Sequence, residues 1–401
     1  MKTIFHRHAS TARSRHLLRL SLIGTLCLSS LAQAQSAYTL TTLKSPTSSG
    51  LEVTDMDNKG KVVGHTYDQV LVFAGNILFG SRLEYWPRIR AASWSATRSS
   101  TITGVRGASK YGPIKTNQAG MTVGQTTTAG SGSPLGYIKP ALEKGGTVTL
   151  LDKEGILQDG YTRIGGINLQ GKAVATVKFL RAPSGQVFTP SISRDAVVLT
   201  SGGITPLDRA GHDSATGNGI NDLGQAVGSV LPRGGAIKAA TWVDGKLTQL
   251  GEDFTEAIAI NNAGQILVTR NALSTTIDEN GNLQPGTPEG PRPGSAALWL
   301  GSQTTRIGNE QQVVKPTAMN NTGTVVGCAD DVSFIWKNGV MLDLLKEVTS
   351  KGVKLPAGAI IECPVAINDA GSIVTAMRYP AGSQVPYPTY NRDWIRLNAT
   401  P

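Results

Sequence analysis

The sequence predicts an all-β protein, a seven-bladed β-propeller closed by an N-terminal strand that pairs in the last blade. Three observations lead to this prediction. A short turn motif recurs seven times at a propeller-like period. Each repeat has room for four short strands. An extra strand stands ahead of the first motif, and the last unit has little room for a fourth strand of its own. Pairing the two would close the ring and remove exposed sheet edges.

The recurring motif is an apolar residue, Asn or Asp, two variable residues and Gly, followed by a β-branched run. Its glycines are Gly60, Gly120, Gly171, Gly224, Gly264, Gly323 and Gly371, at a mean spacing of about 52 residues. Asn or Asp at the start of a type I turn and Gly with positive φ at its end are typical of a tight β-hairpin. Each motif therefore predicts a hairpin between the first two strands of a unit.

The third strand of a unit often carries tryptophan. The copies are Trp94, Trp242, Trp299, Trp336 and Trp394, whereas units two and three offer Gly136-Tyr137-Ile138 and Ala196-Val197-Val198-Leu199. Recurrence at one position of the unit favours blade core over a sugar-stacking platform. The strand left over for closure is Tyr38–Leu43. One helix is predicted, over Leu342–Lys351, with Leu342, Leu345 and Val348 on one face and Gly352 after its end.

The motifs resemble those of the HAF-repeat proteins, an exported bacterial family. Its unit also pairs an Ile-Asn-x-x-Gly turn, as in Ile220–Gly224, with an Ala-x-x-Trp strand and a Leu-Gly end, as in Leu250-Gly251. The resemblance covers roughly residues 37 to 397. No copy reads His-Ala-Phe, and the nearest triplets are Lys238-Ala239-Ala240 and Ser295-Ala296-Ala297. It implies an exported protein of propeller-like repeats and supplies no activity or ligand.

Residues 1–34 have the order of a secretory signal peptide. A basic start precedes the short apolar run Leu20–Leu28, and Ala32-Gln33-Ala34 provides a small-x-small cleavage site after Ala34. The run is too short to span a membrane, and no later stretch has membrane length. We therefore expect residues 35–401 to form a single propeller domain in the periplasm or outside the cell, and to be a monomer.

Charge and chemistry exclude several classes of function. Removing the five basic residues of the leader halves the formal net charge of +10, and no dense Lys/Arg run remains, which argues against nucleic-acid binding. His65 and His212 lie in distant units, so neither a His-based triad nor a zinc site is expected. Asp55–Gly60 faintly resembles a calcium loop, but Lys59 takes a ligand position. No cofactor, metal site or catalytic set is predicted.

Two cysteines follow the leader, Cys328 and Cys363. An even count in an oxidising compartment favours a disulfide, and the alternative is two separate buried thiols. Cys328 ends the second strand of unit six and Cys363 begins the first strand of unit seven. Both ends lie on one face of the ring, so a bridge between adjacent blades is feasible.

The connections between the second and third strands predict a binding surface. They are long in units one, three, five and seven, and they emerge on one face. The alternative reading is insertion that a surface loop tolerates. The aromatic and basic residues typical of binding hot spots gather in units one and seven, which ring closure makes neighbours. They are Tyr85, Trp86, Arg88 and Arg90, and Arg378, Tyr379, Tyr387, Tyr390 and Arg392.

These features favour a secreted, non-enzymatic binding module for a protein or a glycan. The alternative is a polysaccharide-active lyase or a glycoside hydrolase on a propeller scaffold. Two carboxyl groups about 5 to 10 Å apart in a cleft would favour the glycosidase.

Overall fold

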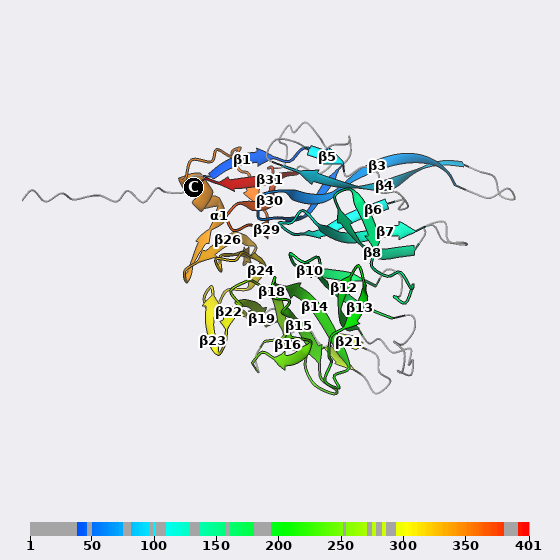
Figure 1. The fold of residues 1–401 in the computed structure, drawn as a ribbon. Helices are drawn as coiled ribbons and strands as arrows, with labels where there is room; N and C mark the ends of the chain where they lie inside the picture. Colours follow the sequence, from blue (N-terminus) through cyan, green and yellow to red (C-terminus); the bar gives the residue numbers. More distant parts are fainter. Residues whose placement is uncertain are drawn as a thin grey trace, which may run out of the picture. The chain divides into compact units, whose positions relative to one another are not determined.

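The computed structural model describes residues 38–45, 50–74, 82–95, 99–101, 110–128, 137–157, 161–179, 194–251, 254–270, 275–277, 283–285, 294–380 and 392–400. Its strands form the predicted seven-bladed β-propeller, within a single unit that begins at Ser36 (Figure 1). The predicted signal peptide and its cleavage site lie outside the described residues. That boundary stays a prediction.

Six blades are consecutive four-stranded antiparallel sheets. Blades 1 to 3 are β2 (Leu51–Met56), β3 (Val62–Ala74), β4 (Arg82–Trp94) and β5 (Ser99–Thr101); β6 (Lys110–Thr116), β7 (Thr122–Thr128), β8 (Tyr137–Lys144) and β9 (Thr147–Leu150); and β10 (Arg163–Ile167), β11 (Ala173–Val177), β12 (Asp195–Thr200) and β13 (Gly203–Pro206). Blades 4 to 6 are β14 (Ser214–Ile220), β15 (Ala226–Leu231), β16 (Lys238–Val243) and β17 (Lys246–Gln249); β18 (Glu256–Ile260), β19 (Ile266–Thr269), β22 (Ala296–Leu300) and β23 (Gln303–Ile307); and β24 (Val314–Met319), β25 (Val325–Ala329), β26 (Val332–Lys337) and β27 (Val340–Asp343).

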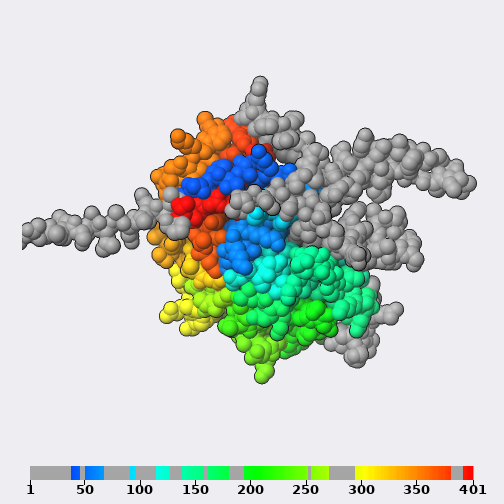
Figure 2. Space-filling view, turned by 45° about the horizontal axis from the view of Figure 1, so that its top comes forward, coloured from blue at the N-terminus to red at the C-terminus, as the bar shows by residue number. Residues whose placement is uncertain are grey.

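Blade 7 joins the two ends of the chain, as predicted. Its order is β1 (Tyr38–Thr42), β31 (Arg392–Ala399) and β30 (Ile373–Arg378), followed by a first strand split into β28 (Ile360–Ile361) and β29 (Ala366–Ile367). Tyr38 pairs with Ala399 and Thr42 with Ile395. Figure 2 shows the blue N-terminal segment lying against the red C-terminal one. The ring is therefore closed by antiparallel pairing across almost the whole sequence.

The seven motifs form the hairpins that the sequence predicts. All seven motif glycines have φ between 77° and 82°, a conformation that favours glycine. In blade 4 the Gly224 N–H donates to the Asn221 carbonyl, and Asn221 Oδ1 accepts from the N–H groups of Leu223 and Gln225. The motif's first polar side chain thus closes its own turn.

The same side chain also ties its blade to the next one. Asn221 Nδ2 donates to the Asn261 carbonyl at 3.1 Å. Equivalent bonds join the other motif asparagines from blade 2 to blade 7, in the pairs Asn117 to Asn168, Asn168 to Asn221, Asn261 to Asn320, and Asn320 to Asn368. Asp57 stands at this position in blade 1 and has no amide to donate. The motif is therefore an inter-blade connector as well as a turn, a role that its sequence alone does not reveal.

The second motif position forms a parallel set of bonds that reaches across the closure. The Asp222 N–H donates to Asn262 Oδ1, and the next two blades repeat this bond. In blade 7 the Asp369 N–H donates to Asn58 Oδ1 at 2.9 Å, and Asn58 Nδ2 returns a bond of 2.6 Å to Asp369 Oδ2. Asp369 therefore holds blade 7 to blade 1 at the hairpin end of the ring.

Replacing Asp369 by alanine should lower the free energy of unfolding by about 2–3 kcal/mol, because hydrogen bonds to a charged acceptor are lost from both Asn58 and Asn321. Asp369→Asn, which keeps an acceptor oxygen, should lose about half as much or less. Urea unfolding of the two variants would measure the difference. Equal losses, or none for alanine, would contradict the connecting role.

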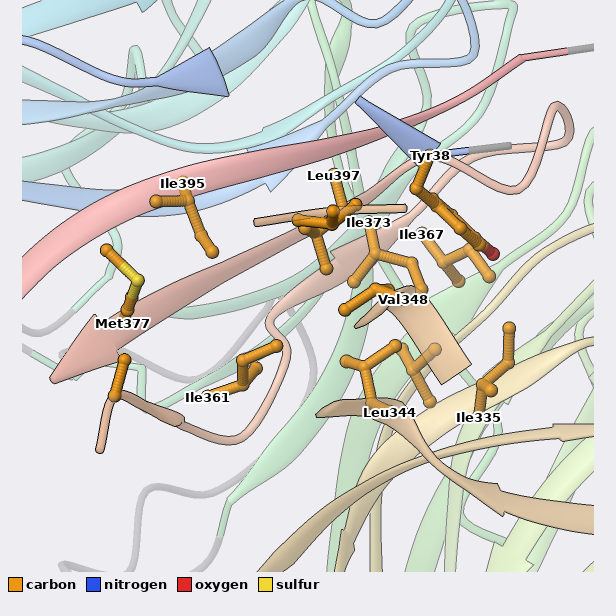
Figure 3. Close-up of a cluster of buried hydrophobic side chains, with 13 residues drawn as sticks. Tyr38, Ile335, Leu344, Val348, Ile361, Ile367, Ile373, Met377, Ile395 and Leu397 are labelled. Atoms are coloured by element: carbon orange, nitrogen blue, oxygen red, sulfur yellow. The ribbon is translucent and has the colours of Figure 1, made fainter. Parts of the chain in front are cut away.

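Apolar side chains fill the spaces between neighbouring blades. Between blades 6 and 7, Ile373, Ile395 and Leu397 pack with Tyr38, Leu344 and Val348 (Figure 3). Between blades 7 and 1, Val374 and Trp394 pack with Val53 and Trp94. Blades 7 and 1 are thus packed neighbours, as the closure predicted.

Tryptophans take two different positions in the blades. Trp94, Trp242, Trp299 and Trp336 each pair with the residue two places after a motif glycine. In blade 7 that position holds Leu397, opposite Ile373, whereas Trp394 is opposite Ala376. Because side chains alternate along a strand, Trp394 points to the opposite side of its sheet and packs on blade 1. The alignment of Trp394 with the other tryptophans was wrong.

Two further expectations are corrected. The long connection of unit one is largely strand, because β3 and β4 stay paired from Val62 with Trp94 to Ala74 with Arg82, and Figure 1 shows them as a long arm. The helix α1 spans Leu344–Ser350, and Asp343 Oδ1 caps it by accepting from the Lys346 N–H. Its buried residues are Leu344 and Val348, and Leu345 packs partly buried against the same cluster. The predicted face was therefore right in Leu345 and Val348 and wrong in Leu342, which is exposed, while Gly352 follows the helix end with positive φ.

Candidate binding surface

The end of each blade opposite its motif hairpin carries the links between blades and the connections between second and third strands. We call this the loop face, formed in blade 7 by the end of β30 and the start of β31. The described part of the predicted site here is Arg378, Tyr379 and Arg392. Tyr387 and Tyr390 lie outside the described residues.

The blade 1 members of the predicted site all lie on β4. Tyr85, Trp86, Arg88 and Arg90 are opposite Leu71, Val70, Asp68 and Thr66 of β3 in the sheet register. Their side chains lie outside the described part of the structure. The predicted meeting of these residues with the blade 7 residues therefore stays a prediction.

Two arginines and one glutamate form the centre of the blade 7 surface. Arg378 and Arg392 are directly opposite each other across β30 and β31. Glu362 Oε2 lies 2.9 Å from Arg392 Nε, and its Oε1 lies 3.8 Å from Arg378 Nε. One carboxylate thus forms a close ion pair with Arg392 and a longer one with Arg378, and the three side chains together carry a formal charge of +1.

Neighbouring contacts fix this group in place. The Arg392 guanidinium lies 4.6 Å from the ring centre of the buried Trp394. The Tyr379 hydroxyl donates to Asp393 Oδ2 at 2.6 Å, and burial, followed by the Asp393 carboxylate, raises the pKa of Tyr379 to about 12. Tyr379 is therefore a half-buried residue that keeps its proton, rather than a freely exposed ring.

The disulfide adjoins this surface. Cys328 of β25 and Cys363 are bonded with their Cα atoms 5.3 Å apart, and they join blade 6 to blade 7. Cys363 directly follows Glu362, whose N–H donates to the Ala376 carbonyl and whose carbonyl accepts from Thr375 Oγ1. Sequence reasoning missed Glu362, whose place beside a predicted bridging cysteine indicated this face of the ring but not a position between the arginines.

A second basic and aromatic pair lies at the same end of blade 3. Lys178 Nζ lies 4.0 Å from the ring centre of Tyr161, and the Tyr161 residue is half exposed. Tyr161 precedes the first strand and Lys178 follows the second, so both stand opposite the Gly171 turn. This cation–π pair was not among the predicted site residues.

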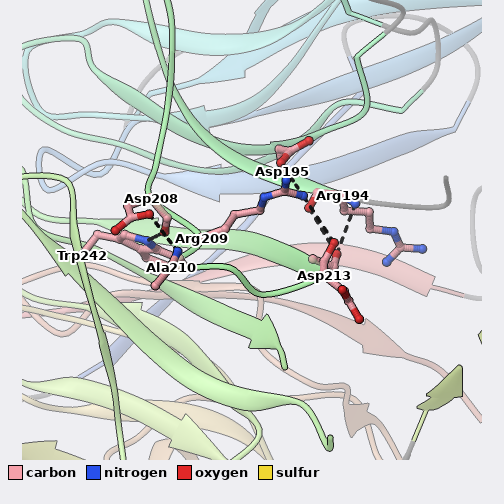
Figure 4. Close-up of polar contacts among 8 residues, drawn as sticks. Arg194, Asp195, Asp208, Arg209, Ala210, Asp213 and Trp242 are labelled. Carbon is pink, nitrogen blue, oxygen red and sulfur yellow. Dashed lines mark hydrogen bonds and ion pairs between the residues drawn. The ribbon is translucent and has the colours of Figure 1, made fainter. Parts of the chain in front are cut away.

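The loop face also holds a structural ion pair between blades 3 and 4. Arg209 Nη1 lies 3.3 Å from Asp195 Oδ1 and also donates to the Asp213 carbonyl (Figure 4). Burial raises the pKa of the Asp195 carboxyl, and Arg209 opposes that shift. Trp242 Nε1 donates to the Asp208 carbonyl in the same link. These contacts stabilise the link between blades 3 and 4. Because Arg209 already has partners within the protein, it is a structural residue of this face.

Two carboxyl groups near the end of the first strand of blade 1, Asp55 and Asp57, have a pKa that burial raises. Asp55 of β2 accepts from the Thr116 N–H of blade 2, and its Oδ1 lies 3.9 Å from Lys115 Nζ. Burial raises the pKa of Asp55, and Lys115 partly counters this.

Within the described ranges, no three His, Cys, Asp or Glu side chains group closely enough to hold a metal ion. No helix among them is long and apolar enough to cross a membrane.

Comparison with known proteins bears on the fold alone. No family model matches the chain, and no curated protein matches it. The β-propeller domain of the Trilobed protease from Pyrococcus furiosus is 12% identical over 88% of this chain and 94% of that chain, with a TM-score of 0.47. An acylaminoacyl peptidase from Pyrococcus horikoshii is 12% identical over 87% of this chain and 51% of that chain, with a TM-score of 0.51. The chain spans about half the length of that peptidase, and its likeness to that structure is one of fold alone.

Proposed function

We propose that this chain is an exported, non-enzymatic binding module of the periplasm or the extracellular space, with its ligand surface on the loop face of blade 7. The leader sequence supports export. The single observation that carries the binding role is the arginine pair, because Glu362 engages both groups through Nε and balances only one of the two charges. Charged groups held ready on a rigid scaffold are typical of binding sites.

A second candidate is a polysaccharide-active lyase or glycoside hydrolase. The observation that favours it is Asp55, since a carboxyl group whose pKa is raised by burial is a candidate general acid. A glycosidase also needs a second carboxyl group within about 5 to 10 Å.

One experiment separates the two functions. The chain without residues 1–34 is immobilised and exposed to panels of bacterial and plant glycans and of secreted proteins, and both retention and cleavage products are scored. We expect retention without cleavage. New reducing ends or unsaturated sugars would favour the enzyme, and loss of them in Asp55→Asn would assign the acid. Absence of both retention and cleavage would overturn the binding role.

A further inference from the structure

We propose that Arg378 and Arg392 form a receptor for the carboxylate groups of an acidic polysaccharide, a polymer of uronic acid residues. This inference rests on the proposed binding function and names its ligand class. Placing two arginines opposite each other on paired strands has a cost in stability. Like charges directly opposite each other on paired strands are destabilising, yet β30 and β31 place two arginines in one register pair.

The Nη groups of Arg378 and Arg392 remain available to a ligand. Glu362 approaches both guanidinium groups at Nε. Among the described residues, no hydrogen bond is donated by the Nη atoms of either arginine. The Arg378 and Arg392 side chains are 56% and 38% exposed. A guanidinium group presents its N–H donors in a planar fork that matches the two oxygens of a carboxylate. Two such forks therefore face the solvent side by side.

Arg392 and Glu362 are held in place before a ligand binds. Arg392 lies over the Trp394 ring, and Glu362 is anchored by the neighbouring disulfide and by two backbone hydrogen bonds. Long arginine side chains lose conformational freedom when they bind a ligand. Holding Arg392 beforehand reduces that loss when a ligand binds.

A second cationic group on the loop face favours an extended ligand, such as a polymer of sugars. A second cationic group, Lys178 over the half-exposed Tyr161, lies on the loop face in blade 3. Blades 3 and 7 are not consecutive in the ring, so a single ligand that contacted both groups would have to be extended. Sugar rings pack on aromatic faces while their carboxylates pair with cations. A polyuronate supplies both chemistries at every repeat.

The test is equilibrium binding of four polymers to the chain without residues 1–34: polygalacturonate, its fully methyl-esterified form, dextran sulfate and poly-glutamate. We expect polygalacturonate to bind most tightly and the ester not to bind. Arg378→Gln with Arg392→Gln should weaken polygalacturonate binding by about ten- to one-hundred-fold. The matched control is Lys246→Gln with Lys337→Gln, which removes two exposed positive charges near hairpins at the other end of the blades. It should change binding by less than about twofold.

Each outcome bears on the proposal. Equal loss in both double variants would show general charge attraction and overturn the receptor. Tighter binding of dextran sulfate would overturn carboxylate selectivity, and tighter binding of poly-glutamate would point to an acidic protein. If some other ligand is retained but the arginine variant keeps full affinity, only this inference fails. If nothing is retained, the binding function fails as well. Circular dichroism melting of each variant shows whether the fold is unchanged.

Discussion

Replacing Asp152 by alanine should lower the free energy of unfolding by about 3–5 kcal/mol, the cost of breaking a buried ion pair from one side. Lys139 Nζ lies 2.9 Å from Asp152 Oδ2, with side chains 11% and 0% exposed. The carboxylate also accepts from the N–H groups of Ile156 and Leu157, and so organises the link between blades 2 and 3. Urea unfolding followed by tryptophan fluorescence would measure the loss.

Two controls define the cause of that loss. Asp152→Ala with Lys139→Met should be less destabilised than Asp152→Ala alone, because it also removes the buried ammonium group that has lost the Asp152 carboxylate. Lys315→Ala removes one side of an exposed pair with Asp331 and should cost no more than about 0.5 kcal/mol. If the double variant is as unstable as the single one, the turn contacts of Asp152 dominate rather than the charge.

Removing the disulfide should lower the free energy of unfolding by about 3–4 kcal/mol. The bond spans 35 residues, and a cross-link of that length restricts the unfolded chain by roughly this amount in the chain-entropy account. Cys328→Ser with Cys363→Ser tests the effect in urea. Reduction of the unchanged protein by a thiol reductant should cause a loss of about this size, and the double variant should lose at least as much.

The comparison of the two treatments separates the cross-link from side-chain packing. Cys328 is buried, so serine there adds a cost of its own that reduction does not. The reductant should leave the stability of the double variant unchanged. A reduced wild-type protein as stable as the oxidised one would contradict the expected role of the bond.

Much of the fold follows from the sequence because the determinants are local and repeated. Gly224 and its equivalents require positive φ, so a periodic glycine reports a periodic turn. The closing strand Tyr38–Thr42 followed from counting strands, since a sheet with unpaired edges is unfavourable. The cysteine pair followed from placing both residues at the same end of adjacent blades.

Other features depend on information that one unit of the repeat does not contain. The amide of Asn221 bonds to Asn261 in another blade, and a turn motif alone does not reveal a partner outside the turn. Trp394 was assigned by residue type, whereas its sheet register places it three residues away from Leu397, the position equivalent to the other tryptophans. The arm of β3 and β4 was interpreted as a long connection between about Gly64 and Ala92, and Tyr85 to Arg90 lack the strict alternation that would indicate a strand.

The candidate site was predictable by residue type and not by geometry. Arg378 and Arg392 were named because arginine is enriched in binding surfaces, and the structure brings these two together. Glu362 arrives from the split first strand of the blade, and neither composition nor spacing places it between the arginines. Lys178 and Tyr161 flank two strands of one blade, so their contact depends on how those strands pair.

The pairing of β1 with β31 also constrains the order of folding. The strand Tyr38–Thr42 is synthesised first, and its partner Arg392–Ala399 is synthesised more than six blades later. Contacts so distant in sequence form slowly, because the intervening chain must first be ordered. Blades 1 to 6 hold all their own strands and can fold during synthesis, whereas blade 7 must wait for the end of the chain. A ribosome stalled before Arg392 would therefore carry an open ring, with the N-terminal strand exposed and available to pair with a neighbouring chain.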